Sequence, residues 1–325
     1  MNLDHRATVG RARRTAEHLG HLVGLQPHRL AQLAMVVTQA ATNVIKHAID
    51  GAILIRPVRA ARQGGVEVIA TDRGPGIADA QAAVRDCRLT AATPGPLIDP
   101  LTWEAAWRDR YSHPGVGTTL AAQIWPDIAP RPHLASGTTR PLTAHLPCGD
   151  GYAVQTTARG VRVLLADGLG HGPLAARATT SAIETFNRIP ATSPADALTI
   201  LHQVLRDTRG AAVAIAELDT TTLLIRFAGV GNLTCATISP TGTRRPLRCQ
   251  PGIVGRHLPT VHEQYTPVTA GDVFIMHSDG VTARWDPLHF PGLFAHAPQL
   301  IAATLLHHAS TRRDDASVLS IRVPA

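Results

Sequence analysis

Four aspartates in the second half of the chain each lie at the end of an expected strand or in the turn beside it. They are Asp150 in CGDGYAV, Asp167 in LLADGLGHG, Asp279 in MHSDGV and Asp314 in RRDDASVL. A carboxylate at a strand end is held in place, and an adjoining glycine lets the backbone approach an ion closely. Converging carboxylates repel one another unless cations lie between them, and hard oxygen ligands of this kind suit Mg²⁺ or Mn²⁺.

Such an aspartate set predicts hydrolysis of a phosphate ester. Two divalent cations about 3.5–4 Å apart can bind the ester and lower the pKa of a bridging water, which gives a nucleophile at neutral pH. The alternative is that these residues only form turns, since Asp-Gly pairs are common turn signals. For one aspartate alone the turn is the commoner explanation, so the metal hypothesis depends on the whole set.

A second group of polar residues lies in the first half. Gln39, Asn43 and Lys46 share the polar face of an expected helix. Asp72 ends an expected strand and runs into the glycine turn DRGPGI, which contains Gly74 and Gly76. Further on, HPGVGTTLA supplies Gly115, Gly117 and Thr118 at the start of an expected helix, where free backbone N–H groups can receive phosphate. Each element is a weak signal alone, because glycine pairs often form plain turns.

Hydrophobic periodicity predicts the elements that position these residues. The first half has a helix over 29–49, a strand over 66–71, an irregular stretch from about 86 to 118, a helix from near Thr118 and a strand over 137–146. The second half has strands over 161–167, 211–218, 222–230, 233–238, 272–279 and 316–323, with helices over 173–186 and about 195–207. This pattern predicts an α+β fold. The pattern of expected helices and strands changes between His145 and Gly149, which predicts two domains, 1–146 and 147–325.

Composition narrows the functional classes. The 325 residues suit two domains, and no apolar run reaches the roughly 18 residues of a membrane span, so we expect no membrane partner. The net charge is +7, but the arginines are scattered and not interleaved with aromatics, so we also expect no nucleic-acid partner. The cysteines are far apart without a CxxC pair, which together with the absence of an apolar signal peptide favours a cytoplasmic protein.

The segments ADGLGHGPLAARA, FAGVGN, MHSDGV and RDDASVLSIR, in this order and spacing, resemble the SpoIIE-type phosphatases. These are the bacterial branch of the metal-dependent (PPM) phosphatases related to the eukaryotic type 2C enzymes. The resemblance covers essentially all of 147–325. It implies an αββα sandwich that hydrolyses phosphoserine or phosphothreonine in proteins, with a dinuclear Mn²⁺ or Mg²⁺ site at one end.

The same resemblance implies roles for single residues. Asp167 would bridge both ions, the Gly168 carbonyl would assist through water, and the other three aspartates would complete the shell. Asp315 is the less expected ligand of its pair, because its position varies in the wider superfamily. His171 would protonate the leaving seryl oxygen; the alternative, a turn histidine that only shapes the loop, stays open.

In the first half, NVIKHA, DxGxGI and GxGTTL resemble the GHKL ATP-binding fold over roughly 10–146, and most of all the anti-sigma-factor serine kinases. The resemblance implies a two-layer α/β sandwich that binds ATP with Mg²⁺. Asn43 would hold the Mg²⁺ and Asp72 would accept from the adenine amine. Gly74 and Gly76 would shape the base pocket, while Gly115, Gly117 and Thr118 would meet the phosphates.

One departure from the kinase pattern concerns catalysis. The kinases usually place glutamate four residues before the asparagine, as the base for the attacking hydroxyl, and this chain has Gln39. An amide can orient a hydroxyl but cannot take its proton. The phosphate loop also lacks the longer glycine-rich GxGLGL run. We therefore expect ATP binding and question phosphoryl transfer.

Together the two halves resemble the kinase and phosphatase modules of bacterial partner-switching pathways. The leading hypothesis is a phosphatase acting on a phosphorylated STAS-domain antagonist, with other stressosome or sigma-regulatory proteins as further partners. Its N-terminal domain would bind the same partner or regulate the phosphatase. The alternatives are a bifunctional kinase and phosphatase, and a non-catalytic protein that sequesters an antagonist or a sigma factor.

Overall fold

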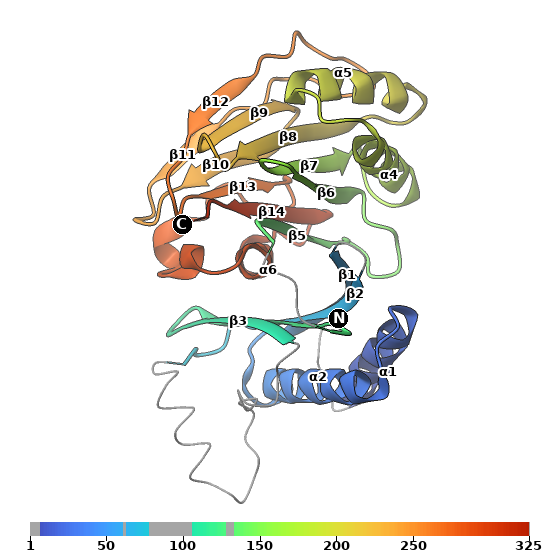
Figure 1. The fold of residues 1–325 in the computed structure, drawn as a ribbon, viewed down its shortest axis with the longest axis vertical. Coiled ribbons are helices and arrows are strands. Elements are labelled where there is room, and N and C mark those ends of the chain that lie inside the picture. Colours follow the sequence, from blue (N-terminus) through green and yellow to red (C-terminus); the bar gives the residue numbers. More distant parts are fainter. Residues whose placement is uncertain (1–6, 61–62, 78–105, 128–132, 325) are drawn as a thin grey trace, which may run out of the picture. The chain divides into compact units, whose positions relative to one another are not determined.

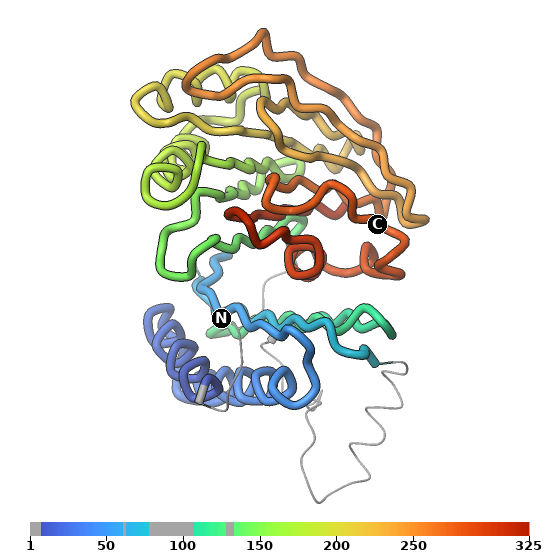
Figure 2. Tube along the Cα trace, turned by 180° about the vertical axis from the view of Figure 1, so that it is seen from behind, coloured from blue at the N-terminus to red at the C-terminus, as the bar shows by residue number. Residues whose placement is uncertain are grey.

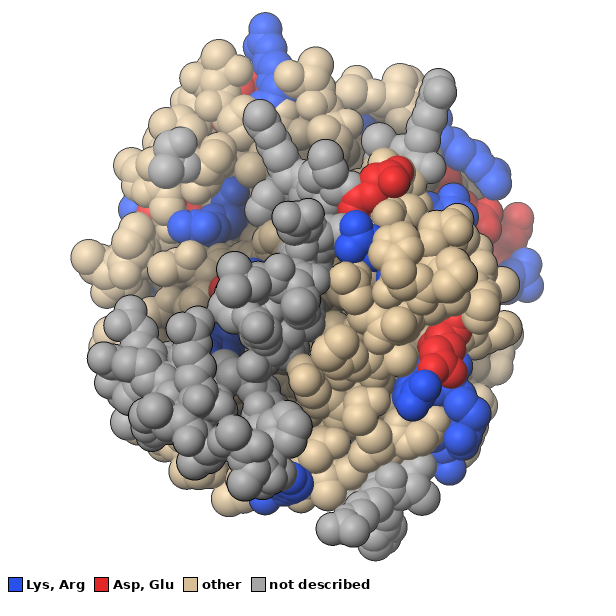
Figure 3. All heavy atoms as spheres, turned by 60° about the horizontal axis from the view of Figure 1, so that its bottom comes forward, with Lys and Arg blue, Asp and Glu red and all other residues tan. Residues whose placement is uncertain are grey.

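The computed structural model describes residues 7–60, 63–77, 106–127 and 133–324. The chain forms two compact units, Met1–Pro132 and His133–Ala325. None of the helices in the described ranges combines the length and the apolar composition that crossing a bilayer requires. On the face drawn in Figure 3, lysines and arginines lie in small separate groups, several of them beside acidic residues.

The first unit is a two-layer sandwich of helices on an antiparallel sheet (Figure 1). Its described elements are α1 (Ala7–Leu22), α2 (Pro27–His47), β1 (Ala52–Ala60), β2 (Gln63–Thr71), β3 (Ala106–His113) and β4 (Gly117–Ile124). The described strands run in the order β1-β2-β4-β3. Helix α2 starts at a proline, which has no N–H to leave unsatisfied, and packs Leu33, Val37 and Val44 into the core against the sheet.

The helix expected from Thr118 is wrong, because 117–124 form strand β4. The apolar stretch Leu120, Ala121 and Ala122 suits a helix by composition, but β4 lies between β2 and β3 and pairs with both. A strand paired on both edges can read as a continuous apolar run, which periodicity does not distinguish from a buried helix. The stretch expected to be irregular also contains β3, while its residues 86–105 lie outside the described ranges.

The second unit has two five-stranded sheets among its described residues, packed face to face between helices (Figures 1 and 2). One sheet runs β12-β9-β8-β7-β6 and the other β11-β10-β13-β14-β5. The strands are β5 (Ala135–Arg140), β6 (Asp150–Thr157), β7 (Gly160–Gly168), β8 (Ala211–Asp219), β9 (Leu224–Val230), β10 (Thr234–Ile238), β11 (Arg244–Leu247), β12 (Gln264–Pro267), β13 (Val273–His277) and β14 (Ala316–Arg322). The arrangement confirms a mixed α/β fold.

Helices α4 (Pro173–Arg188) and α5 (Pro194–Val204) cover the β6–β9 sheet, and α6 (Pro298–Ala309) covers β5 and β14. Between the sheets lies a core that includes Leu165, Phe227 and Phe274, whose last two rings meet edge to face at 5.9 Å. A second core joins α4 and α5 to the outer face of their sheet. Each sheet therefore buries both faces, and the strand ends and their loops remain for chemistry.

The strand expected over 137–146 belongs to the second unit. Strand β5 pairs antiparallel with β14, so that Ser317 lies opposite Thr139. The division between compact units accordingly falls after Pro132 and not at the expected 146/147. Sequence alone placed this strand with the residues that precede it, since no local signal names a partner more than a hundred residues away.

Candidate metal centre

A hairpin brings the first two aspartates face to face. Strand β6 begins at Asp150 and β7 ends at Gly168, and their antiparallel register places Asp150 directly opposite Asp167. The charge of Asp150 raises the pKa of Asp167 across the hairpin. Cross-strand neighbours of like charge repel, so this pair needs either a shared proton or a bound cation.

The other two aspartates come from the facing sheet. Asp279 follows β13 and Asp314 precedes β14, and these strands are antiparallel neighbours, so both residues lie at the same end of that sheet. The charges of Asp279 and Asp314 both reach Asp167, and each raises its pKa. The four predicted metal ligands, 164 residues apart in sequence at the extremes (150 and 314), therefore gather at one end of the sandwich.

Among the described residues, the negative charges of the clustered aspartates are not compensated by positive side chains. Burial, with the negative charge of its neighbours, raises the pKa of Asp150 to about 7 and that of Asp167 to about 9. Burial and Asp314 also raise the pKa of Asp279. In the described part of the chain, no lysine or arginine is ion-paired with any of the four predicted ligands.

This donor set fits divalent cations, although the side chains are not in a coordinating arrangement. Among the described residues, no three His, Cys, Asp or Glu side chains are spaced to hold one ion as they stand. Bound cations would displace protons from the carboxyl groups and remove the mutual repulsion, and all-oxygen donors suit Mg²⁺ or Mn²⁺.

Asp315 has a different environment from its neighbour Asp314. Both of its carboxylate oxygens accept backbone amides: Oδ1 from Leu142 at 2.6 Å and Oδ2 from Gly149 at 2.7 Å. The side chain is 4% exposed, so these bonds are shielded from water. Because both oxygens are occupied, Asp315 positions the loop that leads into Asp150. This is consistent with the expectation that Asp314 is the better ligand of the pair.

Two polar residues beside the aspartates were missed as site residues. Ser278 Oγ donates to Asp150 Oδ2 at 2.5 Å and accepts from the backbone N–H of Ser317 at 2.9 Å. Asn232 Nδ2 donates to Asp279 Oδ2 at 2.7 Å, which lowers the pKa of that carboxyl. Both lie in segments that carry the family resemblance, MHSDGV and FAGVGN. The sequence therefore contained the two residues in recognisable motifs but did not indicate what they contact.

Glycines allow the loops around the cluster to pack closely. A Cβ on Gly168 would lie 2.4 Å from the Ala175 carbonyl oxygen, and one on Gly280 would lie 1.9 Å from the Asp315 carbonyl oxygen. Real Cβ atoms do not approach backbone so closely, so the glycine of each of these Asp-Gly pairs is required by packing. His171 lies exposed between β7 and α4, and its part in proton transfer stays a prediction.

The structure also gathers part of the predicted nucleotide site in the first unit. The loop after β2 packs on the end of α2: Arg73 N donates to the Ile49 carbonyl at 2.8 Å. A Cβ on Gly74 would meet the His47 carbonyl oxygen at 2.9 Å. Gln39 Oε1 is covered and has no hydrogen-bond partner in the described part of the chain, while Lys46 is exposed on α2.

The expected phosphate site at a helix N-terminus is wrong. Gly115 lies in the β3–β4 turn, and Gly117 and Thr118 begin β4. These backbone groups already have protein partners: Gly115 N donates to the Pro75 carbonyl and Asp72 N to the Thr118 carbonyl. The glycines thus let the hairpin lie against the 72–77 loop. Asp72 itself accepts from Gly74 N at 2.7 Å, and burial raises its pKa.

Comparison with known proteins agrees with this geometry. The family model of stage II sporulation protein E (SpoIIE) matches residues 157–324. The chain belongs to the SpoIIE family. The match contains Asp167, Asp279 and Asp314 and begins after Asp150, which the β6–β7 register supplies.

Relatives of the SpoIIE-family unit include phosphatases. Phosphoserine phosphatase RsbX of Bacillus subtilis (strain 168) is 23% identical over 175 residues, 52% of this chain and 83% of the relative. A structure reported under "The bacterial stressosome: a modular system that has been adapted to control secondary messenger signaling" is 28% identical, with a TM-score of 0.54, covering 58% of this chain and 98% of that one. RsbX in complex with magnesium is 19% identical with a TM-score of 0.51, covering 58% and 94%. The second unit is a protein serine/threonine phosphatase.

Proposed function

We propose that the second unit dephosphorylates a serine or threonine of a STAS-domain protein in a cytoplasmic partner-switching pathway that controls a sigma factor. Two Mn²⁺ or Mg²⁺ ions would be held by Asp150, Asp167, Asp279 and Asp314. The observation that carries this proposal is the set of four converging carboxylates without a protein cation among the described residues. The similarity to RsbX and to a stressosome structure supports the choice of partner.

Each side chain has a definite part in this proposal. When bound, the ions supply Lewis acidity toward the phosphate ester and lower the pKa of water. Asp167, opposite Asp150, would help to hold both ions, and the Gly168 carbonyl would assist through a water. Ser278 and Asn232 orient Asp150 and Asp279 through their hydrogen bonds. His171 would deliver a proton to the leaving seryl oxygen.

The test is hydrolysis of p-nitrophenyl phosphate and of phosphorylated STAS proteins from the same genome. We expect activity with Mn²⁺ or Mg²⁺ and none in chelator. The matched variant is Asp167→Asn, which keeps the size and polarity of the side chain. Hydrolysis that survives both chelation and this substitution would contradict the metal proposal. Activity on p-nitrophenyl phosphate without any activity on phospho-STAS proteins would contradict only the partner.

For the first unit we propose a GHKL-type nucleotide domain that binds ATP with Mg²⁺ and regulates the phosphatase or binds its partner. Its two-layer sandwich and the gathering of the 72–77 loop on α2 support this reading. The covered, unpartnered Oε1 of Gln39 lies one helical turn before Asn43 and offers an acceptor to a ligand hydroxyl. Contacts to phosphate at a helix N-terminus are not part of the proposal.

Calorimetry of the full chain with ATP and Mg²⁺ tests this second proposal. We expect binding that Asp72→Asn weakens, because the amide loses the charged acceptor for the adenine amine. If no binding is detected at millimolar ATP, the proposed nucleotide function is contradicted, while the description of the fold is unaffected.

Transfer of labelled phosphate to a STAS protein, measured in an Asp167→Asn background, tests the kinase alternative. Transfer should be slow with Gln39 and rise in Gln39→Glu, since general-base assistance is worth about 10²–10⁴-fold. Robust transfer that glutamate does not improve would favour the bifunctional alternative. If this transfer is absent and the wild-type chain also fails to hydrolyse phosphorylated substrates, the non-catalytic sequestering protein is favoured.

A further inference from the structure

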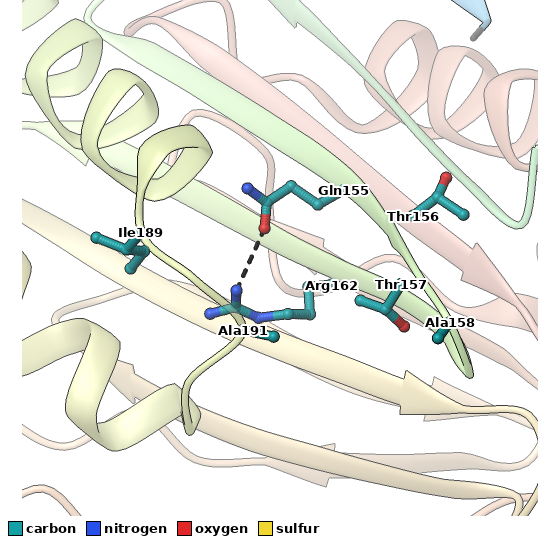
Figure 4. Close-up of a pocket in the computed structure, with 7 residues that line it drawn as sticks. All are labelled: Gln155, Thr156, Thr157, Ala158, Arg162, Ile189 and Ala191. Carbon is teal, nitrogen blue, oxygen red and sulfur yellow. Dashed lines mark hydrogen bonds between the residues drawn. The ribbon is translucent and has the colours of Figure 1, made fainter.

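A cavity of about 470 Å³ lies in the phosphatase unit at the far end of the β6–β7 hairpin from the aspartates (Figure 4). It is lined by Gln155, Thr156, Thr157, Ala158, Arg162, Ile189 and Ala191. Gln155 and Arg162 are cross-strand partners, five residues along their strands from Asp150 and Asp167. At a rise of about 3.4 Å per residue, the cavity is about 17 Å from the metal centre. It is therefore separate from the site of hydrolysis.

The cavity contains a buried cation. Arg162 is 1% exposed, and its guanidinium lies 5.0 Å from the centroid of the Phe186 ring on α4. Nη1 donates to Gln155 Oε1 at 3.3 Å and to the Pro190 carbonyl at 3.4 Å, both long for N–H···O bonds. Gln155 is itself fixed, because its Nε2 donates to the Phe186 carbonyl at 2.8 Å. These contacts orient the guanidinium, and Figure 4 shows the hydrogen bond to Gln155.

The remaining donors of Arg162 have no partner. Nε and Nη2 are covered and make no hydrogen bond within the described residues. No carboxylate there is ion-paired with Arg162: Glu217, its cross-strand neighbour on β8, is paired with Arg226 at 3.8 Å. Leaving a charged group buried with unmet donors is costly, and such groups in native proteins call for a specific explanation.

The two unmet nitrogens are also the two that can act together. In a guanidinium, Nε–H and one Nη2–H point in parallel from the same edge and match the two oxygens of a carboxylate or phosphate. The cavity is also lined by Thr157, which lies on the same face of β6 as Gln155, and by the apolar side chains of Ile189 and Ala191. A polar anchor with a small apolar wall, at this volume, is typical of a small-molecule site.

We propose that this cavity is a binding site for a small organic or inorganic oxoanion, held by Nε and Nη2 of Arg162, with Gln155 fixing the orientation of the guanidinium. Both nitrogens are covered, so the proposal requires that Ile189 and Ala191, in the connection between α4 and α5, give way when a ligand binds. The shared chemistry is a pair of anionic oxygens, present in phosphates and in carboxylates alike. The site is independent of the hydrolytic reaction, because no residue of the metal centre lines it.

The test uses the full chain in chelator, where the carboxylate cluster repels anions. One arm adds inorganic phosphate and the other adds acetate or succinate at millimolar concentrations, with calorimetry and thermal melting as readouts. We expect a saturable rise in melting temperature with at least one anion. Arg162→Met should lose this rise, and Arg162→Lys, which lacks the fork, should bind about tenfold more weakly.

The matched control is Arg159→Ala. Arg159 lies in the turn of the same hairpin, but its side chain is 74% exposed and is 3.6 Å from Asp219, so removing it changes the net charge equally without touching the cavity. We expect its anion affinity to remain that of the wild type. Equal loss in Arg159→Ala and Arg162→Met would show a general charge effect and overturn the proposal.

Residue-resolved NMR of the wild type keeps the test decisive if Arg162→Met does not fold. Signals of Gln155, Thr157 and residues 189–191 should shift on titration, while those of Asp150 and Asp167 should not. A response to phosphate alone assigns a phosphate ligand, and a response to carboxylate alone assigns an organic acid. No saturable response to either anion, or shifts confined to the aspartate cluster, would overturn the proposal.

Discussion

The carboxylate of Asp315 holds the backbone of Gly149 in place, through a hydrogen bond of 2.7 Å from Gly149 N to Oδ2. The other oxygen accepts from Leu142, so both ends of the loop before β6 are tied to one side chain. Gly149 in turn precedes Asp150, and its carbonyl accepts from Thr179 Oγ1 and from Gly168 N. The position of one predicted ligand thus depends on an aspartate that is itself not a predicted ligand.

Replacing Asp315 should therefore destabilise the fold as well as the metal site. Asp315→Ala leaves two buried N–H groups without an acceptor, at about 1–3 kcal/mol each in free energy of unfolding. Asp314→Ala is the matched control: Asp314 Oδ1 accepts only from the adjacent Asp315 N among the bonds described. We expect chemical denaturation in chelator to show the larger loss for Asp315→Ala. Mn²⁺ titration should show weaker binding for both variants. Equal stability of Asp315→Ala and Asp314→Ala would contradict the role of Asp315 in holding the loop before β6.

The Asn232–Asp279 contact predicts a loss of metal affinity on mutation. Asn232→Ala removes the 2.7 Å hydrogen bond that orients Asp279 and favours its charged form. Outer-shell partners of this kind are worth about 10–100-fold in metal affinity or activity. Because Asn232 is exposed, unfolding free energy in chelator should change little. Calorimetric titration with Mn²⁺ measures the effect, and wild-type affinity in this variant would show that Asp279 needs no such support.

Without metal, stability should fall as pH rises through neutrality. The folded state raises the pKa of Asp150 to about 7 and of Asp167 to about 9, above the ordinary value of 3.8 in the unfolded chain. The folded protein therefore binds more protons between these values, and this stabilisation is lost as pH rises from about 4 to about 9. Melting temperature across that range, in chelator, measures it.

Metal should reverse this dependence, because the cations compensate the ionised carboxylates. Asp167→Asn should flatten the metal-free profile, since it removes the group with the larger shift. A metal-free profile unchanged by this substitution would contradict the assignment of the effect to the aspartate pair.

Two neighbouring glycines in the first unit should differ sharply in tolerance. A Cβ on Gly117 would lie 2.1 Å from the Asp72 carbonyl oxygen, whereas one on Gly115 would meet nothing within 4 Å. Both have positive φ, +126° and +78°. Gly115→Ala should thus cost only backbone strain, about 1–2 kcal/mol, while Gly117→Ala adds a clash that separates the hairpin from the 72–77 loop. The stabilities of the two variants can be compared by tryptophan fluorescence during denaturation, since Trp107 and Trp125 lie in the first unit.

The order of the residues is enough to predict the strands that are short apolar runs, the long helix α2, and the four aspartates at strand ends. These features depend on local properties: the periodicity of side chains, a glycine next to an aspartate, and motifs whose order can be read without knowing any contact. For the same reason it identified the phosphatase family, because the segments around Asp167 and Asp279 are contiguous in the chain. It also identified Gln39 as a departure from a catalytic carboxylate, since a residue type is visible without a fold.

The remaining features follow from the folded chain, because pairing between distant segments has no local signature. Thr118 begins a strand, not a helix, since β2 and β3 enclose it on both edges. Strand β5 joins the second unit because its partner is β14. The roles of Asp315 and Ser278 depend on backbone and side-chain groups more than a hundred residues away. The unmet donors of Arg162 likewise follow from packing, because the sequence shows an arginine in a strand but not what its guanidinium meets once buried.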